Sequence, residues 1–463
     1  MKKDYEGYLS PFSWRYGSEE MRQIWSEVNK RRLWRQIWVA LAEVQAEFGL
    51  VQPEQVDDLR AHVDAVDVGR ALEVEAEIHH DLMAELMVFA EQAQKGGGVL
   101  HMGATSMDIE DNADALRVCL SLDLVLENLR TLLKLFADKI EAWADTPLIA
   151  FTHLQPAEPS TLGYRLSIYG QDTLTDWDSL NQLRQRVRGK GFKGAVGSRA
   201  SFGELIGVEN LADFEERMSA HLKLEFFPVT TQTYPRKQDY QIVSTLAGLA
   251  ASLYKFAFDL RLLQSPPIGE LAEPFGSAQV GSSAMPFKRN PINAEKINSL
   301  ARALAQMPRL AWDNAAHSLL ERTLDDSANR RTLLPEAFLT ADELLMVAIW
   351  ILQGLHIDET ALARNLSIYG PFAGTERVLM ALSKCGADRQ VMHERLRDHA
   401  LVAWSAIKNG QPNPLVDLVT RDVSFSAYLS REQLLALLDA ELYIGDAPQR
   451  ALLMAKAIRD TID

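Results

Sequence analysis

The sequence is poor in cysteine, and this excludes a disulfide-stabilised fold. Cys119 and Cys385 are the only cysteines among 463 residues, and neither lies in a spacing typical of a metal site. We therefore expect a reduced, cytoplasmic setting. The first twelve residues, MKKDYEGYLSPF, lack the apolar core of a signal peptide, so we expect no export.

Long hydrophobic runs and basic runs are scarce as well. The longest uncharged apolar stretches, 240–254 and 344–357, fall short of the roughly 18 residues that indicate a membrane span, and we interpret both as buried helices. The net charge is −15, which disfavours binding to nucleic acid or to a membrane surface. A small anionic substrate stays compatible with this charge if basic residues converge locally.

Helical periodicity, by contrast, is abundant. Apolar residues recur at steps of three and four over the long segments 112–144, 161–188, 240–263, 294–320 and 335–355. We expect Asp111 to cap the first of these helices and Pro308 to kink the fourth. The third is apolar nearly all round, which is typical of a helix at the centre of a bundle. The predicted fold class is all-α with a long central bundle, and its apolar flanks indicate a homo-oligomer.

The length of the chain predicts more than one domain, because single cores stop growing at roughly 250–300 residues. The glycine run 96–98 and the loss of helical pattern near 356–358 mark two boundaries. We predict an N-terminal helical domain over 1–105, a central long-helix bundle over 106–357 and a C-terminal helical domain over 358–463. No internal repeat is present, which argues against a helical-repeat scaffold.

Four segments interrupt the helical pattern, and such connecting segments commonly carry function. They are GSSAMPFKRNP (281–291), FTHLQPAEPST (151–161), HMGATSMDIEDNAD (101–114) and ERTLDDSANRR (321–331). Each also has a purely structural interpretation. The first could be a surface linker, the second could hold a structural histidine, the third could be a plain helix cap, and the fourth could be a self-paired charge run.

Together these segments resemble the fumarase/aspartase superfamily, and most closely its adenylosuccinate lyase branch. The likeness extends through SWRYGSEEM (13–21), HHDLMAEL (79–86) and TQTYPRK (231–237), and it covers nearly the whole chain, thinning after about residue 430. Arg289 after Lys288 fits that branch. The resemblance implies three mostly helical domains, a central bundle that forms the core of a homotetramer, and active sites shared between subunits.

The resemblance also implies a reaction: β-elimination of fumarate from adenylosuccinate, giving AMP, and from the succinylated aminoimidazole carboxamide ribotide (SAICAR), giving AICAR. No cofactor and no metal are implied. Proton removal next to a carboxylate needs a base and an electrostatic stabiliser, and the departing nitrogen needs an acid. By resemblance the base is Ser282, helped by Lys288, and the acid is His153, oriented by Glu295.

Substrate contacts are implied in the same way. Asn290, Thr105 and Ser106 resemble residues that bind the succinyl carboxylates. The residues that resemble phosphate and ribose contacts are Arg15, Tyr16, Arg322, Ser327 and Arg331. Gln232, His80 and Asp81 resemble further substrate contacts. The arginines meet the requirement for locally converging cations, because bidentate guanidinium suits a phosphate.

Two positions depart from the family pattern. His79 stands where arginine is common, and Lys296 stands where arginine is often found; lysine keeps the charge but loses the planar fork. Both leave the balance between the two substrates open. The alternatives are another lyase of the superfamily, such as argininosuccinate lyase or a carboxymuconate cycloisomerase, and a non-catalytic structural protein. The phosphate-matching arginines argue against the first alternative, and the presence of Ser282, Lys288 and His153 argues against the second.

Overall fold

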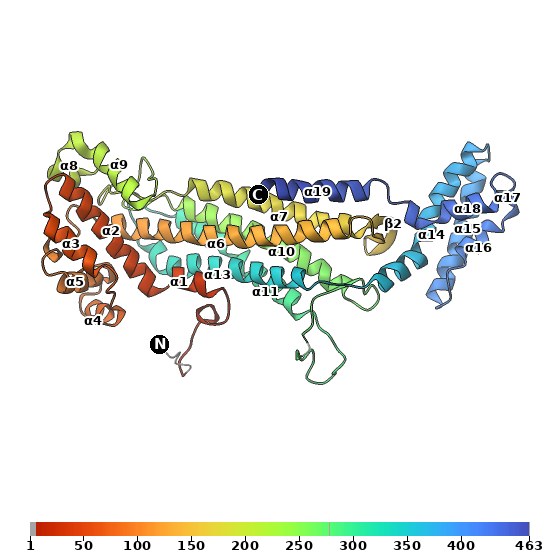
Figure 1. Cartoon of the computed structure of the whole chain (residues 1–463), viewed down its shortest axis with the longest axis horizontal. Coiled ribbons are helices and arrows are strands. Elements are labelled where there is room, and N and C mark those ends of the chain that lie inside the picture. The colour runs from red at the N-terminus through yellow and green to blue at the C-terminus, as the bar shows by residue number, and fades with distance from the viewer. Residues whose placement is uncertain (1–5, 277, 463) are drawn as a thin grey trace. The chain divides into compact units, whose positions relative to one another are not determined.

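The computed structural model describes residues 6–276 and 278–462, and these are predominantly helical (Figure 1). Two small antiparallel sheets interrupt the helices: β1 (Pro147–Thr152) pairs with β2 (Gln155–Thr161), and β3 (Leu271–Ala272) pairs with β4 (His356–Ile357). The predicted all-α class is confirmed. None of the described helices is long and apolar enough to cross a membrane.

The chain forms two compact units, each assembled from three separate segments. Unit 1 comprises Met1–Leu129, Asp176–Leu253 and Ser299–Met346, and unit 2 comprises Arg130–Thr175, Tyr254–Asn298 and Val347–Asp463. The helices that contribute residues to both units are α6 (Ser106–Ala142), α7 (Leu162–Arg186), α10 (Lys237–Leu263), α11 (Ile292–Leu304) and α13 (Asp325–Gln353). The three predicted domains, divided near residues 106 and 358, stay a prediction.

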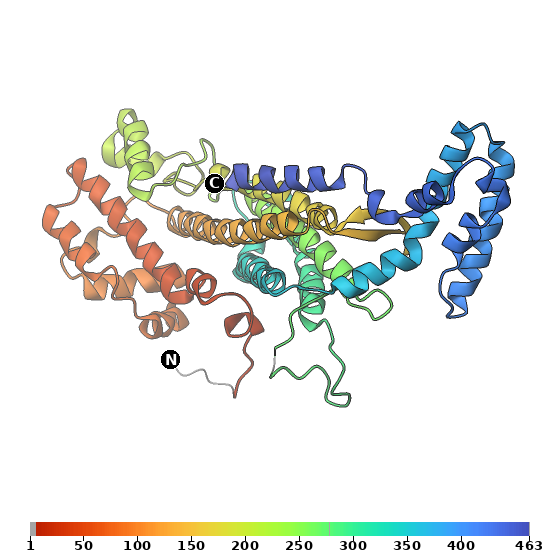
Figure 2. The ribbon, with the colours of Figure 1, turned by 45° about the vertical axis from the view of Figure 1, so that its right-hand side comes forward.

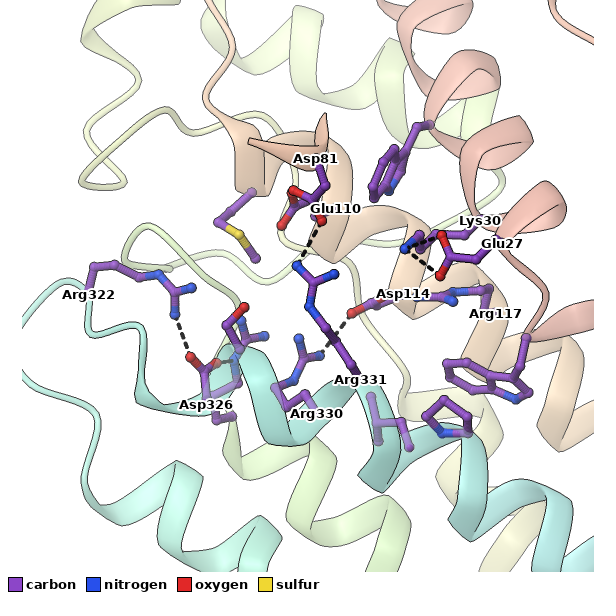
Figure 3. A pocket seen from close by; sticks show the side chains of 17 residues that line it. Glu27, Lys30, Asp81, Glu110, Asp114, Arg117, Arg322, Asp326, Arg330 and Arg331 are labelled. Carbon is purple, nitrogen blue, oxygen red and sulfur yellow. Dashed lines mark hydrogen bonds and ion pairs between the residues drawn. The ribbon is translucent and has the colours of Figure 1, made fainter. Parts of the chain in front are cut away.

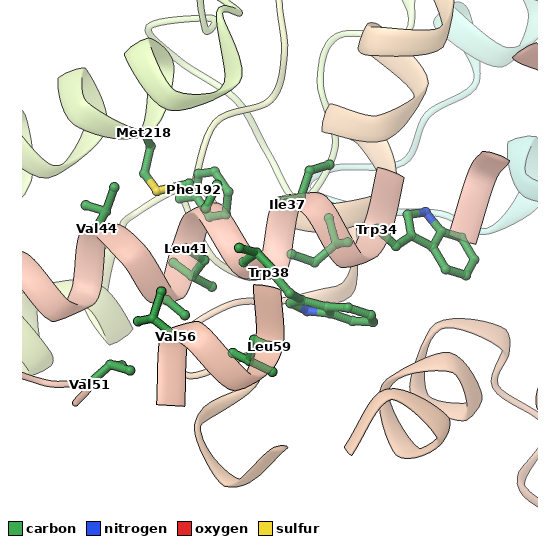
Figure 4. Packing of buried hydrophobic residues seen from close by; sticks show 14 of the residues in the cluster. Trp34, Ile37, Trp38, Leu41, Val44, Val51, Val56, Leu59, Phe192 and Met218 are labelled. Carbon is green, nitrogen blue, oxygen red and sulfur yellow. The ribbon is translucent and has the colours of Figure 1, made fainter. Parts of the chain in front are cut away.

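Unit 1 is built around α2 (Glu27–Glu47), a helix whose apolar residues are buried on several sides. Ser26 caps its N-terminus by accepting a hydrogen bond from the Asn29 N–H. The other helices confined to unit 1 are α1 (Glu19–Ile24), α3 (Pro53–His62), α4 (Val68–Ile78), α5 (Asp81–Gln92), α8 (Ala200–Ile206), α9 (Leu211–Leu222) and α12 (Met307–Ala316). Trp34, Trp38 and Leu41 of α2 pack in a cluster with residues from α3, α9 and the connection before α8 (Figure 4).

A buried ion pair fixes α5 against α2. The Glu85 carboxylate of α5 accepts hydrogen bonds from Arg35 Nε at 2.6 Å and from Arg31 Nη1 at 3.3 Å, and all three side chains are almost wholly buried. Because a buried charge is costly without a partner, this contact specifies how α5 lies on α2. It thereby also positions the residues at the start of α5.

Unit 2 contains a separate helical cluster at the C-terminal end of the chain, drawn in blue (Figures 1 and 2). Its helices are α14 (Glu359–Lys384), α15 (Arg389–Lys408), α16 (Leu415–Thr420), α17 (Val423–Ser426) and α18 (Arg431–Leu438). The last helix, α19 (Ala447–Ile462), lies apart from this cluster, and its Arg459 pairs with Asp138 and Glu141 of α6. Leu382, Leu396, Phe425 and Leu434 lie in the core of α14–α18. Gly374 of α14 permits a close approach to α18, since an added Cβ would lie 2.8 Å from the Leu438 Cα.

Three predicted helix boundaries are wrong. The first long helix begins at Ser106, not at 112, because Asp108 accepts the Thr105 N–H at 2.9 Å and ends the preceding loop there. Asp111 is therefore no cap but a buried side chain inside α6. The segment 294–320 forms two helices, and Pro308 lies in the first turn of α12 rather than at a kink. Helix α13 begins at Asp325, ten residues before the predicted start, with Pro335 inside it.

The expectation that 240–263 is buried on every side is also wrong within a single chain. Gly248 and Ala251 of α10 are exposed, and Phe258 is 52% exposed. This helix thus has one buried apolar face and one exposed face, on which the small residues Gly248 and Ala251 lie beside Lys255 and Phe258.

Replacing Gly374 by alanine tests the packing of α14 on α18. The added methyl group overlaps the backbone of Leu438, so we expect a loss of about 1–3 kcal/mol in the free energy of unfolding. Urea unfolding followed by circular dichroism measures this loss. Gly69→Ala is the control, because that helical glycine of α4 is exposed and its Cβ has ordinary contacts only. Equal stability of the two variants would contradict the tight approach.

Candidate active site

A cavity of about 120 Å³ in unit 1 collects charged side chains from α2, α5, α6 and α13 (Figure 3). We call it the unit 1 cavity. Three of the residues predicted to bind phosphate and ribose line it, namely Arg322, Ser327 and Arg331, and so does Asp81. The fold therefore brings Asp81 and Arg331, which are 250 residues apart in the sequence, to the same cavity. Basic residues converge there, as binding of an anionic substrate to this acidic chain would require.

Arg322 and Arg331 are each held by a carboxylate. Arg331 Nη2 donates to Asp81 Oδ2 at 2.7 Å, and Arg322 Nη1 donates to Asp326 Oδ1 at 2.8 Å. Burial acts to raise the pKa of Asp81, but Arg331 holds that pKa below its usual range; Asp326 behaves in the same way beside Arg236 and Arg322. Both acids are therefore ionised at neutral pH. The self-paired charge run foreseen for 321–331 is present, and it also faces a cavity.

Behind the cavity lies a buried ionic network that fixes the start of α13. Arg330 Nε donates to Asp239 Oδ2 at 2.7 Å, and its Nη2 donates to the Tyr234 hydroxyl at 2.8 Å and approaches an Asp114 oxygen at 3.2 Å. Arg236 donates through Nη1 to Asp111 at 2.9 Å and through Nε to Asp326 at 2.5 Å. These contacts bind α6, α10 and α13 together.

Two donors in this region have no partner among the described residues. Arg236 Nη2 and Arg117 Nε are buried without an acceptor, and both residues line the unit 1 cavity. Buried polar groups are normally satisfied, so these N–H groups favour a ligand rich in acceptor atoms. A phosphate group is such a ligand.

Glu110 is one of the charged cavity residues that sequence analysis missed; Glu27, Lys30, Asp114, Arg117, Arg236 and Arg330 are others. Glu110 lies on α6, four residues after Ser106, and lines the cavity together with Asp81 and Arg331 (Figure 3). Burial first, and then the charges of Asp81, Asp114 and Asp111, raise the pKa of Glu110 to about 8. The helical spacing from Ser106 is the one signal in the sequence that pointed to this position.

The predicted succinyl-binding residues of unit 1 lie at the start of α6. Ser106 Oγ is 3.4 Å from His80 Nε2, and the Thr105 N–H donates to Asp108. Asp108 is itself fixed by the buried Lys190. His80 caps α5, and His79 ends α4 with a left-handed backbone at φ 57°. The structure thus brings His80, Asp81 and Ser106 together.

Other predicted contacts of unit 1 lie outside the cavity lining. Arg15 and Tyr16 follow a short turn, where their N–H groups donate to the Pro11 carbonyl oxygen. The Gln232 N–H donates to the Glu321 carbonyl at 3.1 Å, which places this loop beside Arg322. None of these three is among the residues that line the unit 1 cavity as described.

The predicted base lies in an exposed loop of unit 2. Ser282 Oγ accepts the N–H groups of Met285 at 3.1 Å and Ala284 at 3.3 Å. Asn290 Nδ2 donates to the Gly281 carbonyl at 2.9 Å and closes the loop. Lys288 is exposed on the same loop, and Phe287 is 83% exposed. The loop is thus exposed, as a surface linker would be, and it also has internal hydrogen bonds of its own.

The predicted acid lies at the tip of the β1–β2 hairpin. His153 is exposed, has φ 52°, and lines a mostly apolar cavity of about 810 Å³ in unit 2. Within the described part of unit 2, no hydrogen bond joins His153 to Ser282 or to Glu295. Glu295 of α11 instead approaches Arg261 at 3.6 Å, with Lys296 next to it. One chain therefore does not assemble the predicted acid–base pair.

Replacing Arg330 by methionine tests the buried network. The change leaves Asp239 without its ion-pair partner and Asp114 with Arg117 alone, so we expect a loss of about 3–5 kcal/mol in the free energy of unfolding. Urea unfolding measures the loss. Arg309→Met is the control, because Arg309 pairs with Asp313 on the surface and should change nothing measurable. A stable Arg330→Met protein would show that the network is dispensable.

Comparison with known proteins identifies relatives over almost the full length. A family model described as "Lyase" matches residues 15–305, and one described as "Adenylosuccinate lyase C-terminus" matches residues 371–451. The adenylosuccinate lyase of Saccharomyces cerevisiae is 37% identical over 96% of this chain and 94% of its own. That of Schistosoma mansoni is 38% identical with the same coverage, and that of Pyrococcus abyssi is 36% identical over 95% of each.

Solved structures give the same fold. The 3-carboxy-cis,cis-muconate lactonizing enzyme from Pseudomonas putida aligns with a TM-score of 0.85 and 26% identity, covering 97% of this chain and 99% of its own. A fumarate lyase from Mesorhizobium sp. BNC1 aligns with a TM-score of 0.83 at 24% identity, covering 97% and 99%, which speaks for the fold alone. The predicted relationship to the fumarase/aspartase superfamily is confirmed.

Proposed function

The chain belongs to the adenylosuccinate lyase family of the fumarase/aspartase superfamily, and we propose that it cleaves adenylosuccinate into fumarate and AMP and SAICAR into fumarate and AICAR. The observation that supports this substrate class best is the unit 1 cavity, where Arg322, Ser327 and Arg331 converge. A lyase or cycloisomerase acting on a substrate without phosphate does not need these arginines. The cavity also supplies unpaired N–H donors for an anion.

The proposed chemistry begins with a weakly acidic C–H bond beside a carboxylate. Ser282 removes the proton, and the carboxylate that gains charge is stabilised by N–H donors and cations, Lys288 among them. A serine hydroxyl needs help to ionise. The two backbone N–H groups that Ser282 Oγ accepts in the loop are placed to stabilise its alkoxide form. His153 then protonates the departing nitrogen, and the C–N bond breaks.

We propose that these groups meet across subunits of a homotetramer. Ser282 and His153 are both exposed or half-exposed in unit 2, without a hydrogen bond between them in the described chain. The exposed face of α10 carries the small residues Gly248 and Ala251 and the apolar Phe258, and these suit packing against another copy. On this proposal, Glu295 reaches His153 of another subunit and leaves Arg261. The compartment proposed is the cytoplasm.

Fumarate release from adenylosuccinate by the purified protein is the primary test, followed through the absorbance of the product. We expect Ser282→Ala and His153→Ala each to lower turnover by about 10²-fold or more, because positioned acids and bases contribute that much. Circular dichroism verifies that both variants are folded. Ser283→Ala is the matched control and should keep its activity. If turnover fell more in Ser283→Ala than in Ser282→Ala, the base would be Ser283 and the proposed role of Ser282 would be wrong. If the unaltered protein showed no turnover, the proposed function would be refuted.

Mixing the two inactive variants tests the shared site. If Ser282 and His153 of one site come from different subunits, a mixture of Ser282→Ala and His153→Ala subunits regains about a quarter of the unaltered activity through random reassembly. The activity is measured after dissociation and reassociation of the mixed proteins. Sedimentation of the unaltered protein as a monomer, or no recovered activity after reassembly, would contradict the proposal.

A further inference from the structure

Glu110 has no evident structural partner in the unit 1 cavity. No hydrogen bond or ion pair among the described residues involves its carboxyl group, although it lines the cavity beside Arg331 (Figure 3). Arg331 is already held by Asp81 at 2.7 Å, so Glu110 is not needed to fix it. A half-buried carboxyl group without a partner points to a role with a ligand.

The surroundings of Glu110 disfavour its ionised form. The charged groups that face it are Glu27 and Lys30 on α2, Asp81 on α5, Asp111 and Asp114 on α6, and Arg331 on α13. Lys30 is paired with Glu27 at 2.7 Å, and Arg330 and Arg236 are bound to the acids of the buried network. Burial and the nearby carboxylates raise the pKa of Glu110 to about 8, although Arg331 acts to lower it. At neutral pH the carboxyl group therefore keeps its proton.

We propose that Glu110 binds the phosphate end of the substrate as a neutral acid that donates one hydrogen bond to a phosphate oxygen. This rests on the proposed function, in which Arg322 and Arg331 hold that phosphate. A protonated carboxyl group has an O–H donor, and an ionised one accepts only. The proton thus makes Glu110 a donor for a phosphate dianion, and its loss turns Glu110 into a repelling charge.

The consequence is a defined pH dependence of phosphate binding. The second ionisation of a phosphate monoester lies near pH 6, so the ligand is a dianion at both pH 7 and pH 9. The proton on Glu110 is lost as the pH rises through about 8. If only the protonated form binds, the dissociation constant rises about tenfold between pH 7 and pH 9, because the binding-competent fraction falls from nearly all to about one part in eleven.

Calorimetric titration with AMP tests this with Glu110→Gln. The amide keeps a donor and cannot ionise, so we expect the dissociation constant of this variant to change less than twofold from pH 7 to pH 9, while that of the unaltered protein rises about tenfold. Glu110→Ala removes the donor and should bind AMP more weakly at pH 7 with no rise to pH 9. Glu27→Gln is the matched control, since this other cavity carboxyl is paired with Lys30 and should keep the unaltered pH profile.

The inference would be overturned if the dissociation constant for AMP rose from pH 7 to pH 9 as much in Glu110→Gln as in the unaltered protein. It would also be overturned if the dissociation constant of the unaltered protein did not change between these pH values. Ribose 5-phosphate, which is also a monoester and a dianion at both pH values, is titrated in parallel, so that the pH profile is obtained whether or not the base binds. Thermal unfolding verifies that the variants are folded at both pH values. Failure of the proposed function is seen separately, as absent fumarate release from adenylosuccinate at pH 7 by the unaltered protein.

Discussion

The ionic network around Arg330 and Arg236 is the constraint on which the unit 1 cavity depends. Both guanidinium groups are buried, and each is shared between carboxylates of other helices or loops. Desolvating so many charges is expensive, and apolar residues could pack α13 against α6 and α10 at lower cost. Apolar packing, however, would fix the rotation of α13 about its axis less strictly than directional hydrogen bonds. The hydrogen bonds of the network set this rotation, and they thereby place Arg322, Ser327 and Arg331 on the cavity side.

On the proposed function, this arrangement provides a cavity for an anion within a chain whose net charge is negative. In the unliganded chain Asp81 and Asp326 occupy Arg331 and Arg322, so a phosphate must share these arginines or displace the acids. The carboxylates keep the arginines extended and ordered before the ligand arrives, which lowers the entropic cost of binding. They also weaken binding of any ligand with less charge than a phosphate dianion. The net charge of −15 is therefore compatible with an anionic substrate, because local pairing decides the affinity.

The parts of the fold that follow from local pattern could be predicted, and those that follow from remote partners could not. The segment predicted as a helix over 161–188 is α7, Leu162–Arg186, because its apolar spacing is set within the segment. The starts of α6 and α13 were misplaced because they depend on Asp108 with Lys190 and on Arg330 with Asp239, pairs separated by more than 80 residues. The clustering of Arg322, Ser327 and Arg331 agrees with the residues implied by family resemblance. Glu110 carries no motif, and its environment exists only after folding.

The residues proposed as catalytic pose a different physical problem from the proposed phosphate site. Ser282 and His153 lie at exposed segments of unit 2, where water would screen charges and solvate an alkoxide. Proton removal beside a carboxylate needs the opposite environment, with water excluded and donors already aimed at the growing charge. Exposed apolar side chains on the same loop, Phe287 and Met285, gain a purpose if another subunit covers them. On the proposed function, assembly therefore creates the low-dielectric site, while each chain by itself builds the rigid phosphate end.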